Sequence, residues 1–207
     1  MAIVKRSKND VVDTDERSGA RDFPGLTADL GDENQVKRRW AARDLAIYSQ
    51  AAPVLIERLF LEQDSSVREA ILISLTQIGD DTAVQGFIRC LRSEDARLRN
   101  EAIDAMKNLP DAVAPIMKNL LNDVDPDVRI FSVNVLESLR HPQVENWLIR
   151  VISHDENLNV CGTATDLLCE VGTLAAVLPL EALKQRFPDE PYIAFAADLA
   201  LRRIREA

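Results

Sequence analysis

The residues best suited to catalysis and metal binding, histidine and cysteine, are few in this 207-residue sequence. His141 and His154 stand beside Pro142 and Asp155, with no Cys, Glu or second His at the spacing of a metal site. Such positions favour surface or helix-capping roles. The sequence also has no glycine-rich phosphate loop and no Gly-x-Ser-x-Gly nucleophile elbow. We therefore predict a protein that is not an enzyme, with no catalytic residue, no metal site and no cofactor.

The three cysteines are odd in number and form no Cys-x-x-Cys pair. Cys161 and Cys169 are eight residues apart, so on a helix their side chains point about 80° away from each other. This arrangement disfavours a metal site or a redox pair. Cys90, Cys161 and Cys169 all lie in apolar helical patterns, which predicts reduced core thiols in a reducing compartment and a cytoplasmic protein.

The formal net charge is −9, because 34 Asp and Glu residues outnumber 25 Lys and Arg residues. A field of this sign repels phosphate, so we expect neither nucleic acid nor an anionic membrane as a partner. No run approaches the roughly 20 apolar residues that a membrane span requires. We therefore expect a soluble protein.

One series of arginines recurs at a regular interval and is preceded by recurring acids. A planar guanidinium suits bidentate pairing with a carboxylate in a packed layer, so we predict a structural Asp/Arg ladder. Cys161 replaces the arginine in the fifth copy, which predicts an interrupted ladder and a looser or differently packed junction. Anion binding is the alternative role. The predicted ladder consists of Asp64, Asp95, Asp125, Arg38, Arg68, Arg99 and Arg129.

A second basic series falls once per repeat, near the end of the following apolar segment. The helix dipole alone favours cations there, which is the structural interpretation. The functional interpretation is a basic stripe that binds an acidic or amphipathic segment of another protein. Trp40 and Trp147 fall on apolar helical positions, so we expect them in the core rather than at an interface. The predicted partner-binding residues are Arg58, Arg89, Lys118, Arg150, Lys184, Gln85, Asn119 and Asn146.

Both series belong to an internal repeat that begins near Asp32. Counted from Val67, packing residues follow at offsets of 4, 8 and 11, which places them on one stripe of an α-helix. Equivalent copies start at residues 37, 67, 98, 128 and 160, with separations of 30, 31, 30 and 32 residues. A weaker sixth copy starts near Pro191, with Phe195 and Leu199 in register, and its polar end suits a terminal cap.

Each copy contains a second apolar-periodic segment after a helix-breaking turn such as Gly79-Asp80. Each copy is therefore a helical hairpin that must stack on its neighbours to bury its apolar face. Residues 1–31 are predicted to form a flexible N-terminal arm, although Phe23 and Leu26 could cover the first hairpin. The hairpin units are predicted near 32–62, 63–93, 94–123, 124–154, 155–186 and, as a C-terminal cap, 187–207.

The pattern from Asp64 to Gly79, Asp-x-x-Val-Arg-x-x-Ile-x-x-x-Leu-x-x-Ile-Gly, resembles short HEAT repeats. More narrowly, it is similar to the HEAT-like repeats first described in phycobilisome lyases. The resemblance covers residues 32–207. It implies an all-α fold, an α-α superhelix or HEAT/armadillo-like solenoid of five to six hairpins with a period of about 30–32 residues. In that family the second helices line the concave face.

These features together predict a scaffold or adaptor that binds a partner protein on the concave face of the solenoid. The resemblance to phycobilisome lyase repeats implies an alternative, a lyase-like or chaperone-like accessory protein for the attachment of bilin to phycobiliproteins. A regulatory adaptor in a bacterial signalling assembly is a further alternative. The oligomeric state is left open by the sequence.

Overall fold

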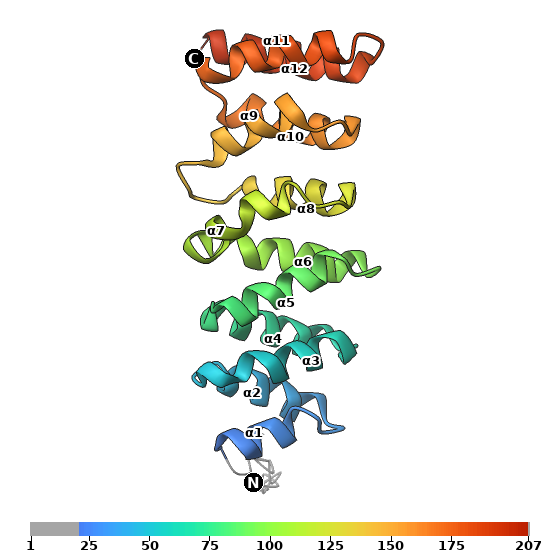
Figure 1. The fold of residues 1–207 in the computed structure, drawn as a ribbon. Helices are drawn as coiled ribbons and strands as arrows, with labels where there is room; N and C mark the ends of the chain where they lie inside the picture. The colour runs from blue at the N-terminus through green and yellow to red at the C-terminus, as the bar shows by residue number, and fades with distance from the viewer. Residues whose placement is uncertain (1–20, 207) are drawn as a thin grey trace, which may run out of the picture. The chain divides into compact units, whose positions relative to one another are not determined.

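The computed structural model describes residues 21–206, which form α-helices, two 3-10 turns and short connections, with no strand in that range. The predicted all-α fold of HEAT-type hairpins is confirmed (Figure 1). The chain divides into two compact units, Met1–Ser74 and Leu75–Ala207, which we describe separately. No helix among the described residues is both long enough and apolar enough to cross a bilayer.

The first unit contains a helix where the sequence predicted a flexible arm. For residues 21–31 that prediction is wrong, and residues 1–20 lie outside the described residues. Asp22 caps the new helix, and Leu26 and Leu30 are buried although the segment has few apolar residues. The Phe23 ring also packs on Tyr48, with ring centroids 5.6 Å apart. The helices of this unit are α1 (Phe23–Asp29), α2 (Gln35–Leu45), η1 (Ser49–Ala51), α3 (Ala52–Leu61) and most of α4 (Ser65–Ile78).

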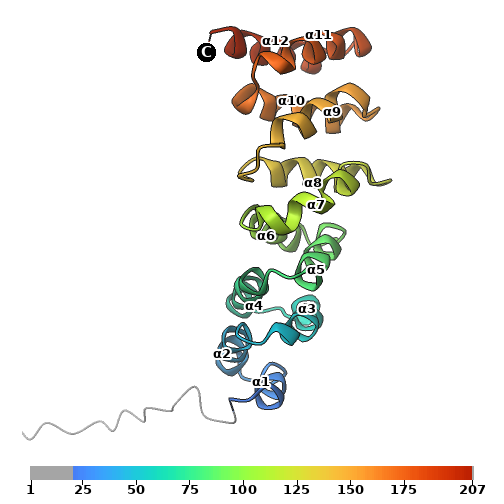
Figure 2. The ribbon, with the colours of Figure 1, turned by 60° about the vertical axis from the view of Figure 1, so that its left-hand side comes forward.

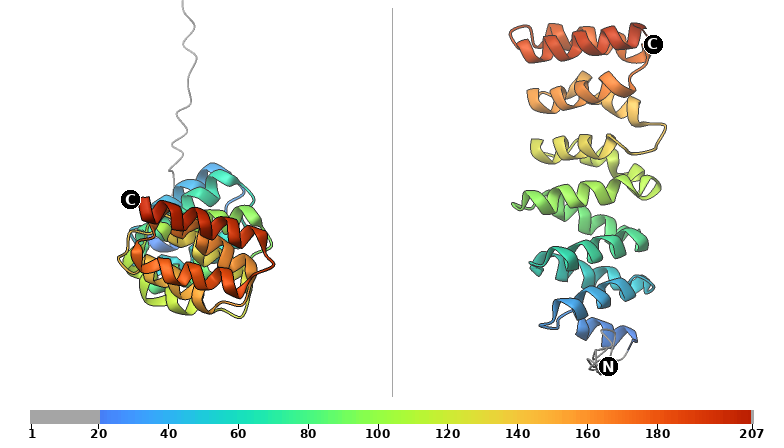
Figure 3. Two further views of the ribbon diagram at one scale, coloured as in Figure 1. Left: turned by 90° about the horizontal axis from the view of Figure 1, so that it is seen from above. Right: turned by 180° about the vertical axis from the view of Figure 1, so that it is seen from behind.

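The second unit contains two series of helices. The first helices of successive hairpins, α6, α8, α10 and α12, contact one another in order. Among the second helices, α5 contacts α7, and α9 contacts α11. The hairpin α11/α12 lies as one layer beside α9/α10 in Figures 1, 2 and 3. The elements are α5 (Asp81–Leu91), α6 (Ala96–Lys107), α7 (Pro110–Leu120), α8 (Pro126–Leu136), α9 (Val144–His154), α10 (Leu158–Val171), η2 (Leu174–Ala176), α11 (Val177–Arg186) and α12 (Pro191–Glu206).

The apolar stripe predicted for the first helices lies in the core. The residues at offsets 4 and 8 are buried in all five copies, from Ala41 and Leu45 to Ala164 and Leu168. At offset 4 four of the five copies have a small residue, which allows the helices to approach closely, and the exception is Ile71. In α8 this position is Ser132, whose hydroxyl donates to the Val128 carbonyl. The stripe therefore defines the buried face of each first helix.

The sixth copy has a different register from the predicted one. Phe195 and Leu199, expected on the buried stripe, are 68% and 40% exposed. The buried stripe of α12 instead runs through Ile193, Ala197 and Leu201. The prediction placed the start of the stripe at Pro191, but the buried residues with the same offsets start at Ile193, two residues later.

Candidate functional site

The ladder arginines share one contact that secures the turn before their own helix. Arg38, Arg68, Arg99 and Arg129 each donate a hydrogen bond to the carbonyl six residues earlier. Asp64, Asp95 and Asp125 cap helices α4, α6 and α8 by accepting hydrogen bonds from first-turn amides. The arginine in each copy therefore ties the helix to the loop from which it starts.

The carboxylates that pair with two of these arginines were not the predicted ones. Arg38 forms a bidentate pair with Glu62, at 2.8 and 3.0 Å, and Arg129 forms one with Asp155, at 2.7 and 3.0 Å. Pairing with the capping aspartates was predicted, but those oxygens are directed at helix amides. Glu62 and Asp155 each lie two residues before the N-cap residue of a first helix. From there the side chain reaches the arginine on the first helix of the preceding hairpin.

A signal for these acids was present in the sequence. Each buried stripe starts at residue 37, 67, 98, 128 or 160, and the residue five positions earlier has the same role in every copy. Its side-chain oxygen accepts a hydrogen bond from the backbone amide two residues further along the chain. Such turns explain why an acid or a serine recurs there. The five residues are Asp32, Glu62, Ser93, Asp123 and Asp155.

Glu62 is the most enclosed of these acids, at 1% exposure. It accepts hydrogen bonds from Arg38, from Arg58 at 2.7 Å, and from the backbone amides of Gln63 and Asp64. Burial alone would raise the pKa of Glu62, but the hydrogen bonds from Arg38, from the Asp64 amide and from Arg58 outweigh it and lower the pKa to about 2. Glu62 is therefore a charged structural centre of the first unit.

The junction at Cys161 is differently packed, and a second residue supplies the missing guanidinium. The Cys161 thiol donates a hydrogen bond to the Asp155 carbonyl, six residues earlier. In the other copies the ladder arginine contacts the carbonyl at this equivalent position. Arg186, at the end of α11, donates to the carbonyls of Asp155 and Ile152 and to the Cys161 sulfur, 3.2 Å away. A guanidinium thus reaches this junction from the following helix.

The cysteines are expected to differ in reactivity. Cys90 and Cys161 are fully buried and Cys169 is half-buried. Burial raises the pKa of Cys161 to about 11 in spite of the Arg186 guanidinium, so its thiolate is scarce at neutral pH. With Ellman's reagent at pH 8 we expect Cys169 to react roughly 10-fold or more faster than the other two thiols in folded protein, and all three to react in denaturant. Rapid native labelling of Cys161, located by mass spectrometry, would contradict this structure.

The structure separates the members of the predicted basic stripe. Arg58 is directed to Glu62, and Lys184 pairs with Asp198 on α12. Arg89, Gln85, Asn119 and Asn146 are exposed on their helices. Lys118 and Arg150 are brought together at one cavity.

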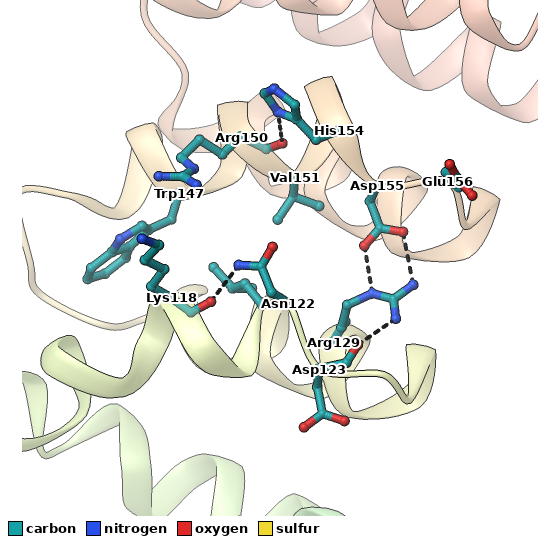
Figure 4. A pocket seen from close by; sticks show the side chains of 11 residues that line it. Lys118, Asn122, Asp123, Arg129, Trp147, Arg150, Val151, His154, Asp155 and Glu156 are labelled. Atoms are coloured by element: carbon teal, nitrogen blue, oxygen red, sulfur yellow. Dashed lines mark hydrogen bonds and ion pairs between the residues drawn. The ribbon is translucent and has the colours of Figure 1, made fainter.

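The cavity lies in the second unit between the end of α7 and helix α9 and has a volume of about 400 Å³ (Figure 4). Lys118 and Arg150 have no carboxylate partner among residues 21–206, whereas the Arg129 charge is balanced by Asp155. Hydrogen bonds from Arg92 keep the pKa of Asp123 below its usual value, so this acid is also compensated. The lining residues are Lys118, Leu121, Asn122, Asp123, Arg129, Trp147, Arg150, Val151, His154, Asp155 and Glu156.

Trp147 lies at the edge of this cavity beside Lys118 and Arg150 (Figure 4). Core packing was predicted, but the side chain is only half-buried, because Val144, Leu148 and Val151 fill the core face of α9. Its ring stacks on His141, with centroids 4.9 Å apart and planes 11° apart. The cavity thus combines two cations that have no carboxylate partner among residues 21–206 with a flat aromatic wall, while Glu156, which also lines it, has no cationic partner in that range. Among the described residues there is no group of three or more His, Cys, Asp and Glu side chains that could hold a metal ion.

The fold and these repeating contacts define the class of the protein. Residues 23–107 match the family model described as HEAT repeats. The chain is a HEAT-repeat protein, with short repeats of the kind that the sequence pattern indicated. The bilin biosynthesis protein PecE of Mastigocladus laminosus is 30% identical to this chain over 151 residues, which cover 71% of this chain and 56% of the relative. A PecE from Nostoc is 39% identical over 74 residues, or 35% of this chain and 29% of that protein. The chain therefore spans about half, or less, of the curated relatives that it matches.

A solved structure described as the complex of CpcE and CpcF of phycocyanin lyase from Nostoc is also similar in fold. It is 18% identical, covers 97% of this chain and 98% of that chain, and has a TM-score of 0.38. The prediction that the chain is not an enzyme is overturned by the two curated relatives, which are described as bilin biosynthesis proteins. The relatives support the lyase-like alternative of the sequence analysis better than its main prediction of a scaffold or adaptor, to which the packing residues of the repeats had led.

Proposed function

We propose that this protein is a HEAT-repeat subunit of the bilin-lyase type, which holds an open-chain tetrapyrrole and acts together with a partner protein. The observation that carries the proposal is the 30% identity with PecE over 151 residues. Buried free cysteines suit a reducing compartment, in keeping with a cytoplasmic location. The proposal gives this chain the binding and positioning of the bilin and assigns no covalent step to any of its residues.

The cavity between α7 and α9 has the chemistry that a bilin requires. A bilin is a flat conjugated chain of four pyrrole rings with two propionate carboxylates. Lys118 and Arg150 would pair with a propionate, and Trp147 would contact the face of a ring. The volume of about 400 Å³ falls within the range of small-molecule sites, about 300–1,000 Å³.

Tryptophan fluorescence tests this proposal, because Trp40 and Trp147 are the two tryptophans of the chain. In a Trp40→Phe background, biliverdin is expected to quench Trp147 saturably. Biliverdin dimethyl ester, which has no free carboxylate, is expected to bind roughly 10-fold more weakly, because it loses its charge-assisted hydrogen bonds to Lys118 and Arg150, and a 10-fold loss corresponds to about 1.4 kcal/mol.

Charge reversal at the cavity gives the matching change on the protein. Lys118→Glu and Arg150→Glu are each expected to weaken biliverdin binding by about 10-fold. Arg202→Glu is the control, since Arg202 is exposed on α12 and does not line the cavity. Equal affinity for the acid and the ester, or equal effects of all three variants, would contradict binding at this cavity.

A further inference from the structure

An apolar strip lies exposed on the last second helix of the chain. Leu174, in η2, and Leu178, in the first turn of α11, are 74% and 76% exposed. Ala182 lies one turn further along α11 and is also exposed. Isolated surface leucines are common, but exposed apolar residues that recur at intervals of four residues are of the kind that marks an interface.

The strip continues the surface on which the cavity opens. Two contacts align α11 with α9: the Thr173 amide donates to Glu145 at the start of α9, and Arg186 donates to the Ile152 carbonyl near its end. Leu180 and Leu148 are the buried residues at equivalent positions of the two helices. Counting from them places Leu178 at the level of Asn146, and Ala182 at the level of Arg150.

The two adjoining helix faces therefore differ in character. On α9 the face carries Asn146 and Arg150, and Lys118 meets Arg150 at the cavity. On α11 the same positions are apolar. Lys118 and Arg150 carry charges without a carboxylate partner among residues 21–206, so a ligand spanning both helices would be apolar along one edge and acidic along the other.

We propose that the α9–α11 face, formed by Leu174, Leu178, Ala182, Arg150 and Lys118, binds an acidic amphipathic helix of another protein. Leucine-type anchors of that helix would cover Leu174 and Leu178, and its Glu or Asp residues would face Arg150 and Lys118. The proposal builds on the partner-binding part of the proposed function and specifies the surface and the chemistry of the partner. Because the bilin and the partner helix would both use Lys118 and Arg150, the binding of each is measured in the absence of the other.

The probe is a synthetic 18-residue helical peptide with Leu along one edge and Glu along the adjacent edge. Fluorescence anisotropy of the labelled peptide, without bilin, measures its affinity for the full chain. A peptide of the same composition in scrambled order and a peptide with Lys in place of Glu are expected to bind roughly 10-fold or more weakly. Equal binding of the three peptides, or no binding of the first, would overturn the proposal.

Matched variants locate the site. Leu174→Glu and Leu178→Glu are expected to weaken peptide binding by about 10-fold or more, because they place a charge on the strip and repel the acidic edge. Leu61→Glu is the control, since Leu61 on α3 is 70% exposed and lies in the first unit. A loss equal to that of Leu178→Glu in the control would also overturn the proposal.

The peptide experiment and the bilin experiment test the two proposals independently. Leu178 belongs to the docking face and not to the cavity, whereas Trp147 belongs to the cavity and not to the docking face. If Leu178→Glu abolishes peptide binding and biliverdin still quenches Trp147, both proposals stand. If biliverdin does not bind but the peptide distinguishes Leu178→Glu from Leu61→Glu, the docking face stands and the bilin site is rejected.

Discussion

Replacing Glu62 with alanine is expected to lower the free energy of unfolding of the first unit by about 3–5 kcal/mol. The carboxylate is 1% exposed and balances Arg38 and Arg58, while it also accepts two backbone amide hydrogen bonds. Its removal leaves two guanidiniums without their carboxylate and two amides without their acceptor at a largely buried position. Urea unfolding followed through Trp40, in a Trp147→Phe background, reports on the unit that contains it.

Glu69→Ala is the matched control, because Glu69 is an exposed acid on α4. Its effect is expected to stay within about 0.5 kcal/mol, as for ordinary surface positions. Similar losses for Glu62→Ala and Glu69→Ala would show that the buried carboxylate does not organise this unit.

The same carboxylate predicts a specific pH dependence. Its pKa is lowered from an ordinary value of 4.5 to about 2, so its contribution is fully present above about pH 4.5 and is lost as the pH falls towards 2. A shift of this size corresponds to about 3 kcal/mol, of which about 2 kcal/mol is lost by pH 3. The stability difference between the wild type and Glu62→Gln should therefore shrink between pH 5 and pH 3. A difference that stays constant over this range would contradict the lowered pKa.

Restoring the ladder arginine with Cys161→Arg is expected to destabilise the second unit by about 3 kcal/mol. Cys161 is completely buried, and Arg186 already donates to the carbonyl that a new arginine would need. Two guanidiniums would then compete for one acceptor in a filled space, which combines overpacking with an unpaired charge. Urea unfolding followed through Trp147, in a Trp40→Phe background, measures the change.

A double-mutant cycle distinguishes this competition from simple overpacking. Arg186→Ala removes the competing guanidinium, so Cys161→Arg should cost about 2 kcal/mol less in that background. Cys161→Leu adds volume without charge and serves as the control, with a cost that Arg186→Ala changes little. Additive effects of Cys161→Arg and Arg186→Ala would show that Arg186 does not replace the missing ladder arginine.

The hairpins were predictable because their signals are local. A stripe at offsets 4 and 8 defines the buried face of a helix through the geometry of the helix itself, and residues such as Asp95 cap the amides of the turn that follows them. Even the four acids and Ser93, which lie five positions before the stripes, could have been found by aligning the copies. The shifted stripe of α12 could not, since Pro191 and Ile193 both begin apolar series, and packing against α10 and α11 selects the second.

The class of fold, the repeat length and the buried faces of the first helices in the first five copies follow from local sequence patterns, because helix periodicity and capping act within one or two turns. Which charges meet depends instead on how the hairpins pack. Arg38 pairs with Glu62 from 24 residues away, and Arg186 contacts Cys161 from 25 residues away. The cavity at Lys118 and Arg150 likewise exists because two helices hold these side chains together, while Lys184 of the same series is paired with Asp198. Such pairings depend on the path of the backbone between the residues, which short-range spacing does not encode.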